Sequence, residues 1–207
     1  IIGGQSSSNF EKFINYIVLE PKNITNFDLA SVCVGNGDDA GIDGLAIAIN
    51  NRFVNNMSEL KSYIELGMEF SVEFYFIQAK TSSSFECKEI RTFGEGVVDS
   101  FRQEDELKKN MNSVMKEKYN MIREIIENYE YTKERKCYLY YVTLGKYVED
   151  SNLLSTKTRI IEDIERQGLF KRSDINIQIE DNDYIRKQYE STKMQNSATF
   201  KLNSKLD

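Results

Sequence analysis

Histidine is absent from all 207 residues of this chain, and its absence removes whole classes of catalytic chemistry. Hydrolases that activate a serine or a cysteine through histidine are excluded, because an imidazole is the general base of such sites. Metal sites that bind through imidazole nitrogen are excluded as well. A metal ion bound by this chain must therefore be held by oxygen, which favours magnesium, manganese or calcium.

Cysteine is scarce, and the three residues Cys33, Cys87 and Cys137 stand far apart. No Cys-x-x-Cys pair occurs, so the sequence indicates neither a zinc knuckle nor a redox pair. We interpret the three thiols as buried and reduced, as is typical of a cytoplasmic protein. The chain also lacks an apolar run of about 18 residues, the length that crosses a bilayer, and it lacks an N-terminal signal pattern. We therefore expect a cytoplasmic protein with no membrane partner.

Positive charge is in deficit, with a net charge of -6 and an isoelectric point near 5.0. This balance argues against a strongly basic nucleic-acid surface, so nucleic-acid binding would require a local positive groove. Apolar side chains are sufficient in number, at 40% of residues, for a core of ordinary size. Length and composition together predict one globular domain.

Hydrophobic periodicity predicts an α/β fold with a mixed sheet. The order of segments is helix, strands, helix, strand, helix, strand, after a loose lead-in over residues 1–8. The apolar stripe over residues 97–129 predicts a helical region, which the polar segment "RQEDELKKN" divides into two helices. Expected helices cover residues 10–20, 57–66 with Ser58 as N-cap, 97–129, 152–170 and, as helix or coil, 183–195. Expected strands cover residues 45–51 with 51–54 as a hairpin return, 72–80, 137–145, 175–181 and 198–203.

The strand predicted over residues 72–80 changes from mostly apolar to polar side chains at its end, where "IQAK" follows a run rich in apolar residues. Gln78 and Lys80 stand two positions apart, so they point to the same face of the strand. A lysine is rarely buried without a partner, so this strand end is a candidate site. The same face should carry, deeper in the sheet, Val72, Phe74 and Phe76, and the opposite face, against helices, Tyr75 and Ile77.

The segment "GNGDDAGIDG" has the glycine and aspartate content of several ligand-binding loops. A dinucleotide loop is rejected, because Asp38 and Asp39 lie where a pyrophosphate would approach and a strand pattern follows. A calcium-binding EF-hand loop is rejected, because Gly41 and Asn50 occupy ligand positions. The remaining interpretations are an ordinary acidic turn and a single acidic ligand, Asp43, at the start of a strand. Asp38 and Asp39 are expected mainly to shape the loop.

Asp43, Gln78 and Lys80 together have the chemistry of metal-assisted phosphodiester cleavage. An aspartate binds a divalent metal, and the amide oxygen of Gln78 and the backbone carbonyl of Ala79 complete the protein ligands. Lys80 donates hydrogen bonds and positive charge to the attacking water or to the phosphate oxygens.

This arrangement resembles the PD-(D/E)xK nuclease superfamily, in a variant that reads D-…-QxK. It resembles more closely the N-terminal nuclease-like domain of abortive-infection phage-resistance (AIPR) proteins, through "DDAGIDGLAIAINN", "EFYFIQAKTSSSF" and "EIRTFGEGVVDSF". The likeness covers about residues 10–101. It implies a restriction-endonuclease-like mixed β-sheet flanked by helices, with 1–207 as one nuclease domain and an N-terminal fragment of a longer protein. The implied activity is cleavage of nucleic acid, DNA before RNA, with Mg²⁺ or Mn²⁺ in anti-phage defence.

Carried over by residue, the resemblance assigns Asp43, Gln78 and Lys80 to the catalytic core. The family adds a glutamate on the first helix, for which Glu11 is the best match and Glu20 the weaker one. Gln78 is neutral, so the site holds a metal with one negative charge fewer than the acidic form of the motif. A catalytically inactive module that binds nucleic acid or acts as a scaffold therefore remains the alternative. A homodimer and the absent C-terminal region of the same protein are further expected partners.

Overall fold

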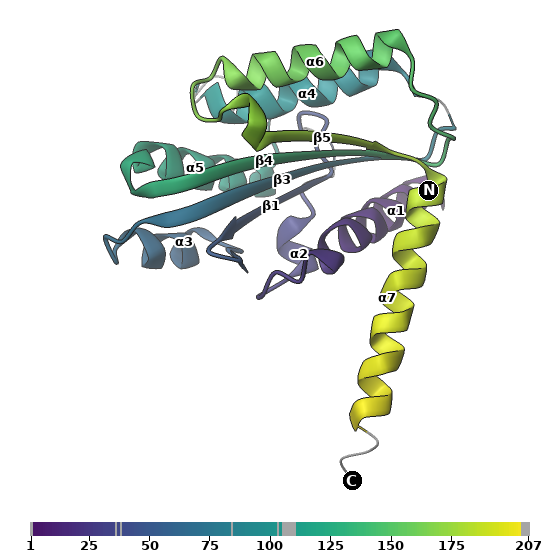
Figure 1. Cartoon of the computed structure of the whole chain (residues 1–207), viewed down its shortest axis with the longest axis horizontal. Helices are drawn as coiled ribbons and strands as arrows, with labels where there is room; N and C mark the ends of the chain where they lie inside the picture. Colours follow the sequence, from purple (N-terminus) through teal and green to yellow (C-terminus); the bar gives the residue numbers. More distant parts are fainter. Residues whose placement is uncertain are drawn as a thin grey trace.

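The computed structural model describes residues 2–35, 37, 39–83, 85–102, 104 and 111–203, with side chains between residues 7 and 193 of those ranges. A five-stranded sheet of order β2-β1-β3-β4-β5 forms its centre, and helices lie on both faces (Figure 1). The predicted α/β class with a mixed sheet is confirmed. The strands are β1 Gly44–Ile49, β2 Arg52–Phe53, β3 Phe70–Lys80, β4 Thr132–Thr143 and β5 Ile175–Glu180. The helices are α1 Ile2–Leu19, α2 Leu29–Val32, α3 Met57–Ile64, α4 Cys87–Arg102, α5 Ser113–Glu127, α6 Ser151–Glu165 and α7 Asn182–Asn203, with short 3₁₀ helices η1 Glu20–Lys22, η3 Tyr129–Tyr131 and η4 Arg172–Asp174.

The predicted hairpin is confirmed in β1 and β2, which pair antiparallel through Ala48↔Phe53 and Ile49↔Arg52. Its two turn residues, Asn50 and Asn51, have φ of 48° and 62°. Asparagine tolerates this left-handed region, and a two-residue turn of this kind follows the twist of the strands it joins. β1 also pairs antiparallel with β3, whereas β3, β4 and β5 run parallel to one another.

The central strand is β3, as the sequence predicts, and its two faces belong to two separate cores. Val72, Phe74 and Phe76 are buried in a core with residues of α3, α4, α5 and α6. Tyr75 and Ile77 lie in the other core, with residues of α1, α2 and α7. The alternation read from the sequence therefore assigned these side chains to the correct faces. β3 is therefore packed between two helical layers, one formed by α3, α4, α5 and α6 and the other by α1, α2 and α7.

Several predicted boundaries are wrong, although the elements exist. The lead-in over 1–8 is largely helical, since α1 begins at Ile2, and α4 begins at Cys87 rather than at residue 97. The N-cap of α3 is Asn56, whose side chain accepts a hydrogen bond from the backbone N–H of Glu59, and not Ser58. The strand expected over 198–203 lies within α7, because a short alternating pattern alone does not separate a strand from a polar helix.

The long helical stripe divides in two as expected, into α4 and α5, and the segment with Leu107 lies outside the described residues. One face of α5 is buried through Met115, Tyr119, Ile122 and Ile125. Among the described helices, none has a stretch that is both long and apolar enough to span a membrane.

Candidate functional site

The candidate site forms where β1 begins beside the end of β3. In the antiparallel register Gly44 is opposite Ile77, and the backbone N–H of Asp43 donates to the carbonyl of Ile77 over 2.9 Å. Strand pairing thus brings Asp43 next to Gln78, although 35 residues separate them in the chain. The sequence analysis placed Asp43 at the start of one strand and Gln78 at the end of another, and the antiparallel register of β1 and β3 brings these two strand ends together.

Asp43 and Gln78 are in direct contact and almost fully buried, at 8% and 5% exposure. Oδ2 of Asp43 accepts a hydrogen bond of 2.6 Å from Nε2 of Gln78 and one of 2.8 Å from the backbone N–H of Ala79. The amide nitrogen of Gln78 therefore faces the carboxylate, and its oxygen lies on the side of Gly41. In this arrangement Gln78 orients Asp43 rather than offering its own oxygen alongside the carboxylate.

The pKa of Asp43 is raised to about 7, chiefly because burial penalises the charged carboxylate. The hydrogen bond from Ala79 acts in the opposite direction, the nearby carboxylates of Glu11 and Asp39 raise the pKa further, and Lys80 lowers it. A carboxyl group with this pKa changes between its protonated and ionised forms near neutral pH. A cation placed beside it would favour the ionised form.

Glu11 on α1 faces Asp43 across Gly35. A Cβ atom on Gly35 would lie 3.0 Å from Oε2 of Glu11 and 3.2 Å from Oδ1 of Asp43, so the two carboxylates border the space that a side chain would fill. Ser7 holds the other oxygen of Glu11 through a hydrogen bond of 3.0 Å. We call the adjoining cavity of about 70 Å³ the acidic pocket; it is lined by Ser8, Glu11, Lys12, Cys33, Gly35 and Asp43.

Lys80 lines a second cavity, which Gln78 also borders. This cavity of about 300 Å³, here the lysine cleft, lies between the end of β3 and the start of α4. Tyr141 donates a hydrogen bond of 3.0 Å to Glu89 at its wall. The contact between Gln78 and Asp43 thus stands between the acidic pocket and the lysine cleft. The lining residues of the lysine cleft are Gly41, Gln78, Lys80, Glu86, Lys88, Glu89, Thr92 and Phe93.

Asn15 is a residue of the site that the sequence analysis missed. It is fully buried, and its Nδ2 donates to the backbone carbonyl of Asp43 over 3.2 Å and to Sγ of Cys33 over 3.5 Å. A Cβ atom on Gly44 would overlap the Asn15 amide, so glycine is required there. The available signal was a polar residue four positions after Glu11, inside the apolar stripe of the first helix.

The acidic pocket offers two carboxylates, from Glu11 and Asp43, and the ammonium group of Lys12, which is not a closed protein cage for a metal ion. Among the described residues, no group of three or more histidine, cysteine, aspartate or glutamate side chains is placed to hold a metal. Magnesium commonly binds through one or two carboxylates and fills its remaining positions with water and phosphate oxygens. Glu11 and Asp43, on either side of the Gly35 Cβ position, supply those two carboxylates.

The remaining predicted residues are placed as follows. Glu20 lies in η1, which begins directly after α1 ends at Leu19, nine positions after Glu11. Asp39 shapes the loop as expected, since its Oδ1 accepts from the backbone N–H of Gly41 over 2.9 Å, and Asp38 lies outside the described residues.

All three cysteines are free, and only Cys137 is buried, so the expectation of burial is wrong for Cys33 and Cys87.

Comparison of the chain with models of known protein families, with curated proteins and with solved structures gives no match.

Proposed function

We propose that this chain is a metal-dependent endonuclease-like domain that hydrolyses phosphodiester bonds in nucleic acid, with DNA as the favoured substrate. The observation that carries the proposal is the contact of Asp43 with Gln78 at the end of β3, with Glu11 across Gly35 and Lys80 two residues further along. A restriction-endonuclease-like fold, a place in anti-phage defence and kinship with AIPR proteins belong to the same proposal. They rest on the resemblance of the sequence segments.

Each residue has a distinct role in the proposed reaction. Glu11 and Asp43 would hold Mg²⁺ or Mn²⁺, which would supply Lewis-acid activation of the phosphate and of water. Gln78 and the N–H of Ala79 keep Asp43 oriented through Oδ2, which leaves Oδ1 directed to the acidic pocket. Lys80 contributes positive charge to the phosphate oxygens from the lysine cleft.

A second candidate is a non-catalytic module of the same fold that binds nucleic acid or a partner protein. Two observations favour it. The pKa of Asp43 near 7 leaves its carboxyl group partly protonated at neutral pH, and among the described residues two carboxylates, no more, border the acidic pocket. Both features lower the affinity for a metal ion, and without a metal the cleavage chemistry is lost.

Nicking of supercoiled plasmid in Mg²⁺ or Mn²⁺ tests the proposal. We expect Asp43→Asn and Lys80→Met to lose activity by about 10²–10³-fold, the usual cost of removing a preorganised charge. Glu11→Gln should lose activity, whereas Glu20→Gln, a matched change in η1, should not. Each variant is first checked for a cooperative thermal transition, so that loss of activity is not loss of fold.

The outcomes separate the two candidates. Equal cleavage by the wild-type chain and by Lys80→Met would show that the site is wrong. No cleavage in either metal, combined with saturable binding of the plasmid or of an oligonucleotide, would favour the non-catalytic module.

A further inference from the structure

The amino end of β4 has a backbone edge that no strand covers. β3 pairs with β4 from Thr132 onward, with a shift of register at Lys133, but on the other side β5 pairs with β4 only from Cys137. Within the described residues, positions 133–136 of β4 therefore have no strand on their outer side (Figure 1). We call this gap the β4 notch. It lies at the amino ends of the parallel strands, whereas the candidate site lies at the carboxyl end of β3.

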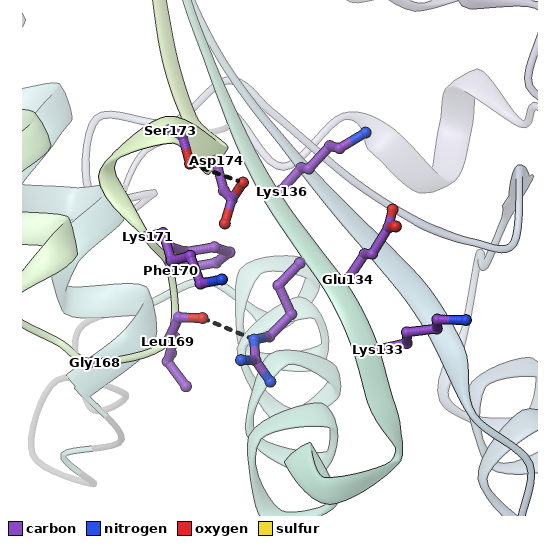
Figure 2. A pocket seen from close by; sticks show the side chains of 10 residues that line it. Lys133, Glu134, Lys136, Gly168, Leu169, Phe170, Lys171, Ser173 and Asp174 are labelled. Carbon is purple, nitrogen blue, oxygen red and sulfur yellow. Dashed lines mark hydrogen bonds between the residues drawn. The ribbon is translucent and has the colours of Figure 1, made fainter.

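The β4 notch contains a cavity of about 650 Å³, larger than either cavity of the candidate site. Its opposite wall is the segment 168–174, which leads into β5. Figure 2 shows Phe170, Lys171 and Asp174 on that segment, while the side chains of Lys133 and Lys136 project from β4 away from it. The backbone of β4 thus forms one wall of the cavity. Arg135 joins the two walls, since its Nε donates to the carbonyl of Leu169 over 2.8 Å.

Charge around the β4 notch is opposite in sign to that of the whole chain. Four cationic residues border it against two anionic ones, in a chain whose net charge is -6. Lys133 and Lys171 are exposed at the two walls, and Lys136 approaches Glu73 only at 3.9 Å. The local excess of positive charge favours an acidic ligand.

An apolar depression adjoins the notch and shares Arg135, Leu169 and Phe170 with it. Its other walls include Ile126 and the ring of Tyr129, which is 59% exposed. The depression is shallow, at about 10 Å³, so an apolar side chain of a ligand running along β4 would lie over it beside Tyr129 rather than enter it. Residues of an extended chain point alternately to the two sides, so every second side chain would face this way. The notch therefore offers backbone hydrogen bonds, positive charge and one apolar contact.

We propose that the β4 notch is a strand-addition site for an extended, acidic peptide segment of a partner protein. The peptide backbone pairs with residues 133–136, in the place that a longer β5 would occupy. Its alternate carboxylates lie on the side to which Lys133 and Lys136 project, and its other side chains lie on the side of Phe170 and Tyr129. Peptide recognition by an added strand takes its affinity from main-chain hydrogen bonds and its specificity from alternate side chains. Lysines at a strand edge also serve to prevent such pairing, and that explanation predicts no binding. The proposal is independent of the nuclease chemistry at the carboxyl end of β3.

The test is an NMR titration of the ¹⁵N-labelled chain with an acetylated and amidated pentapeptide, Glu-Val-Glu-Val-Glu. We expect saturable shifts of the backbone amides of residues 133–136. The same peptide with N-methylated valines should bind at least about tenfold more weakly, because its blocked nitrogens cannot donate. Lys133→Glu and Lys136→Glu should weaken binding by about tenfold each through charge reversal, whereas Lys61→Glu, an exposed change on α3, should leave it unchanged.

Four results would overturn the proposal. The first is an absence of shifts at residues 133–136 at millimolar peptide. The second is equal affinity for the N-methylated peptide, which would reduce the effect to general charge attraction. In the third, a DNA oligonucleotide shifts the same amides at lower concentration, and the notch is a nucleic-acid contact. In the fourth, the free chain dimerises and protects these amides, and the occupant is a second copy.

Discussion

At the residue scale, the raised pKa of Asp43, about 7, makes the stability of the fold depend on pH where ordinary aspartates are fully ionised. The folded pKa lies above the unfolded value of 3.8, so the folded state binds the proton more tightly. This contribution to stability is fully present below the unfolded pKa and is lost as the pH rises through about 7. Above that pH the buried carboxylate destabilises the fold.

Asp43→Asn should therefore gain stability relative to the wild-type chain as the pH rises from 5 to 8. The asparagine oxygen can accept both hydrogen bonds now made by Oδ2, and it carries no charge to desolvate. We expect the difference in free energy of unfolding to grow by on the order of a few kcal/mol over this range. Urea unfolding of both proteins at each pH, without metal, measures it. Parallel pH profiles of the two proteins would contradict the assigned pKa.

Gly35→Ala should separate metal binding from folding. The new methyl group would occupy the space 3.0 Å from Oε2 of Glu11 and 3.2 Å from Oδ1 of Asp43. Glu11 can move aside at small cost, because its carboxylate ends a flexible side chain, so the fold should be retained while the two carboxylates are forced apart. The measurement is the rise in Tm on adding Mn²⁺, which reports binding to the folded state. We expect the rise to be much smaller in Gly35→Ala and unchanged in Ser8→Ala, another lining residue of the acidic pocket.

Some residues of the candidate site could be predicted from the sequence, and others could not. Asp43, Gln78 and Lys80 were found because each is a polar residue at the end of an apolar strand. Asn15 was missed because a single amide in an apolar helical stripe does not reveal that it binds the backbone of Asp43. The direction of the Gln78 amide is equally hidden, since it depends on which atom of Asp43 it meets.

At the scale of elements, the close packing of α4 on α6 depends on Gly94. A Cβ atom there would lie 2.5 Å from Cγ1 and 2.7 Å from Cδ1 of the buried Ile160. Gly94→Ala gains about 1 kcal/mol of helix propensity, but overpacking a filled core costs about 1–3 kcal/mol. We expect net destabilisation in urea unfolding, and recovery in the double variant Gly94→Ala/Ile160→Ala relative to Ile160→Ala alone. A more stable Gly94→Ala would show that the two helices separate easily.

The centres of the sheet strands were easier to predict than the helix starts, although β4 begins at Thr132 rather than at residue 137 and the strand expected over 198–203 lies in α7. The hairpin of β1 and β2 and the two faces of β3 follow from local alternation and from two adjacent asparagines. Helix starts depend on capping geometry, and at α3 the cap is Asn56, although Ser58 is also a capping type. The β4 notch was invisible in the sequence, because it results from the different lengths of two strands that meet only in the sheet.

At the scale of the whole molecule, the net charge of -6 opposes the approach of a nucleic acid. Charge in the lysine cleft is balanced, since Lys80 and Lys88 lie with Glu86 and Glu89. Substrate binding in the proposed function therefore depends on the metal, whose charge is added to this region when it occupies the acidic pocket.

The binding of DNA should accordingly require a divalent cation. Fluorescence anisotropy of a labelled duplex with Lys80→Met, the variant expected to cut slowly, should show weak binding in EDTA and a gain of about tenfold or more in Mn²⁺. Adding Asp43→Asn to this variant should abolish the gain, because the added positive charge is then no longer held at the site. In the proposed function few phosphates are contacted through side chains, so the loss of affinity with added salt should be shallow. Equal binding in EDTA and in Mn²⁺, with a steep dependence on salt, would instead place the DNA on a basic surface away from Asp43.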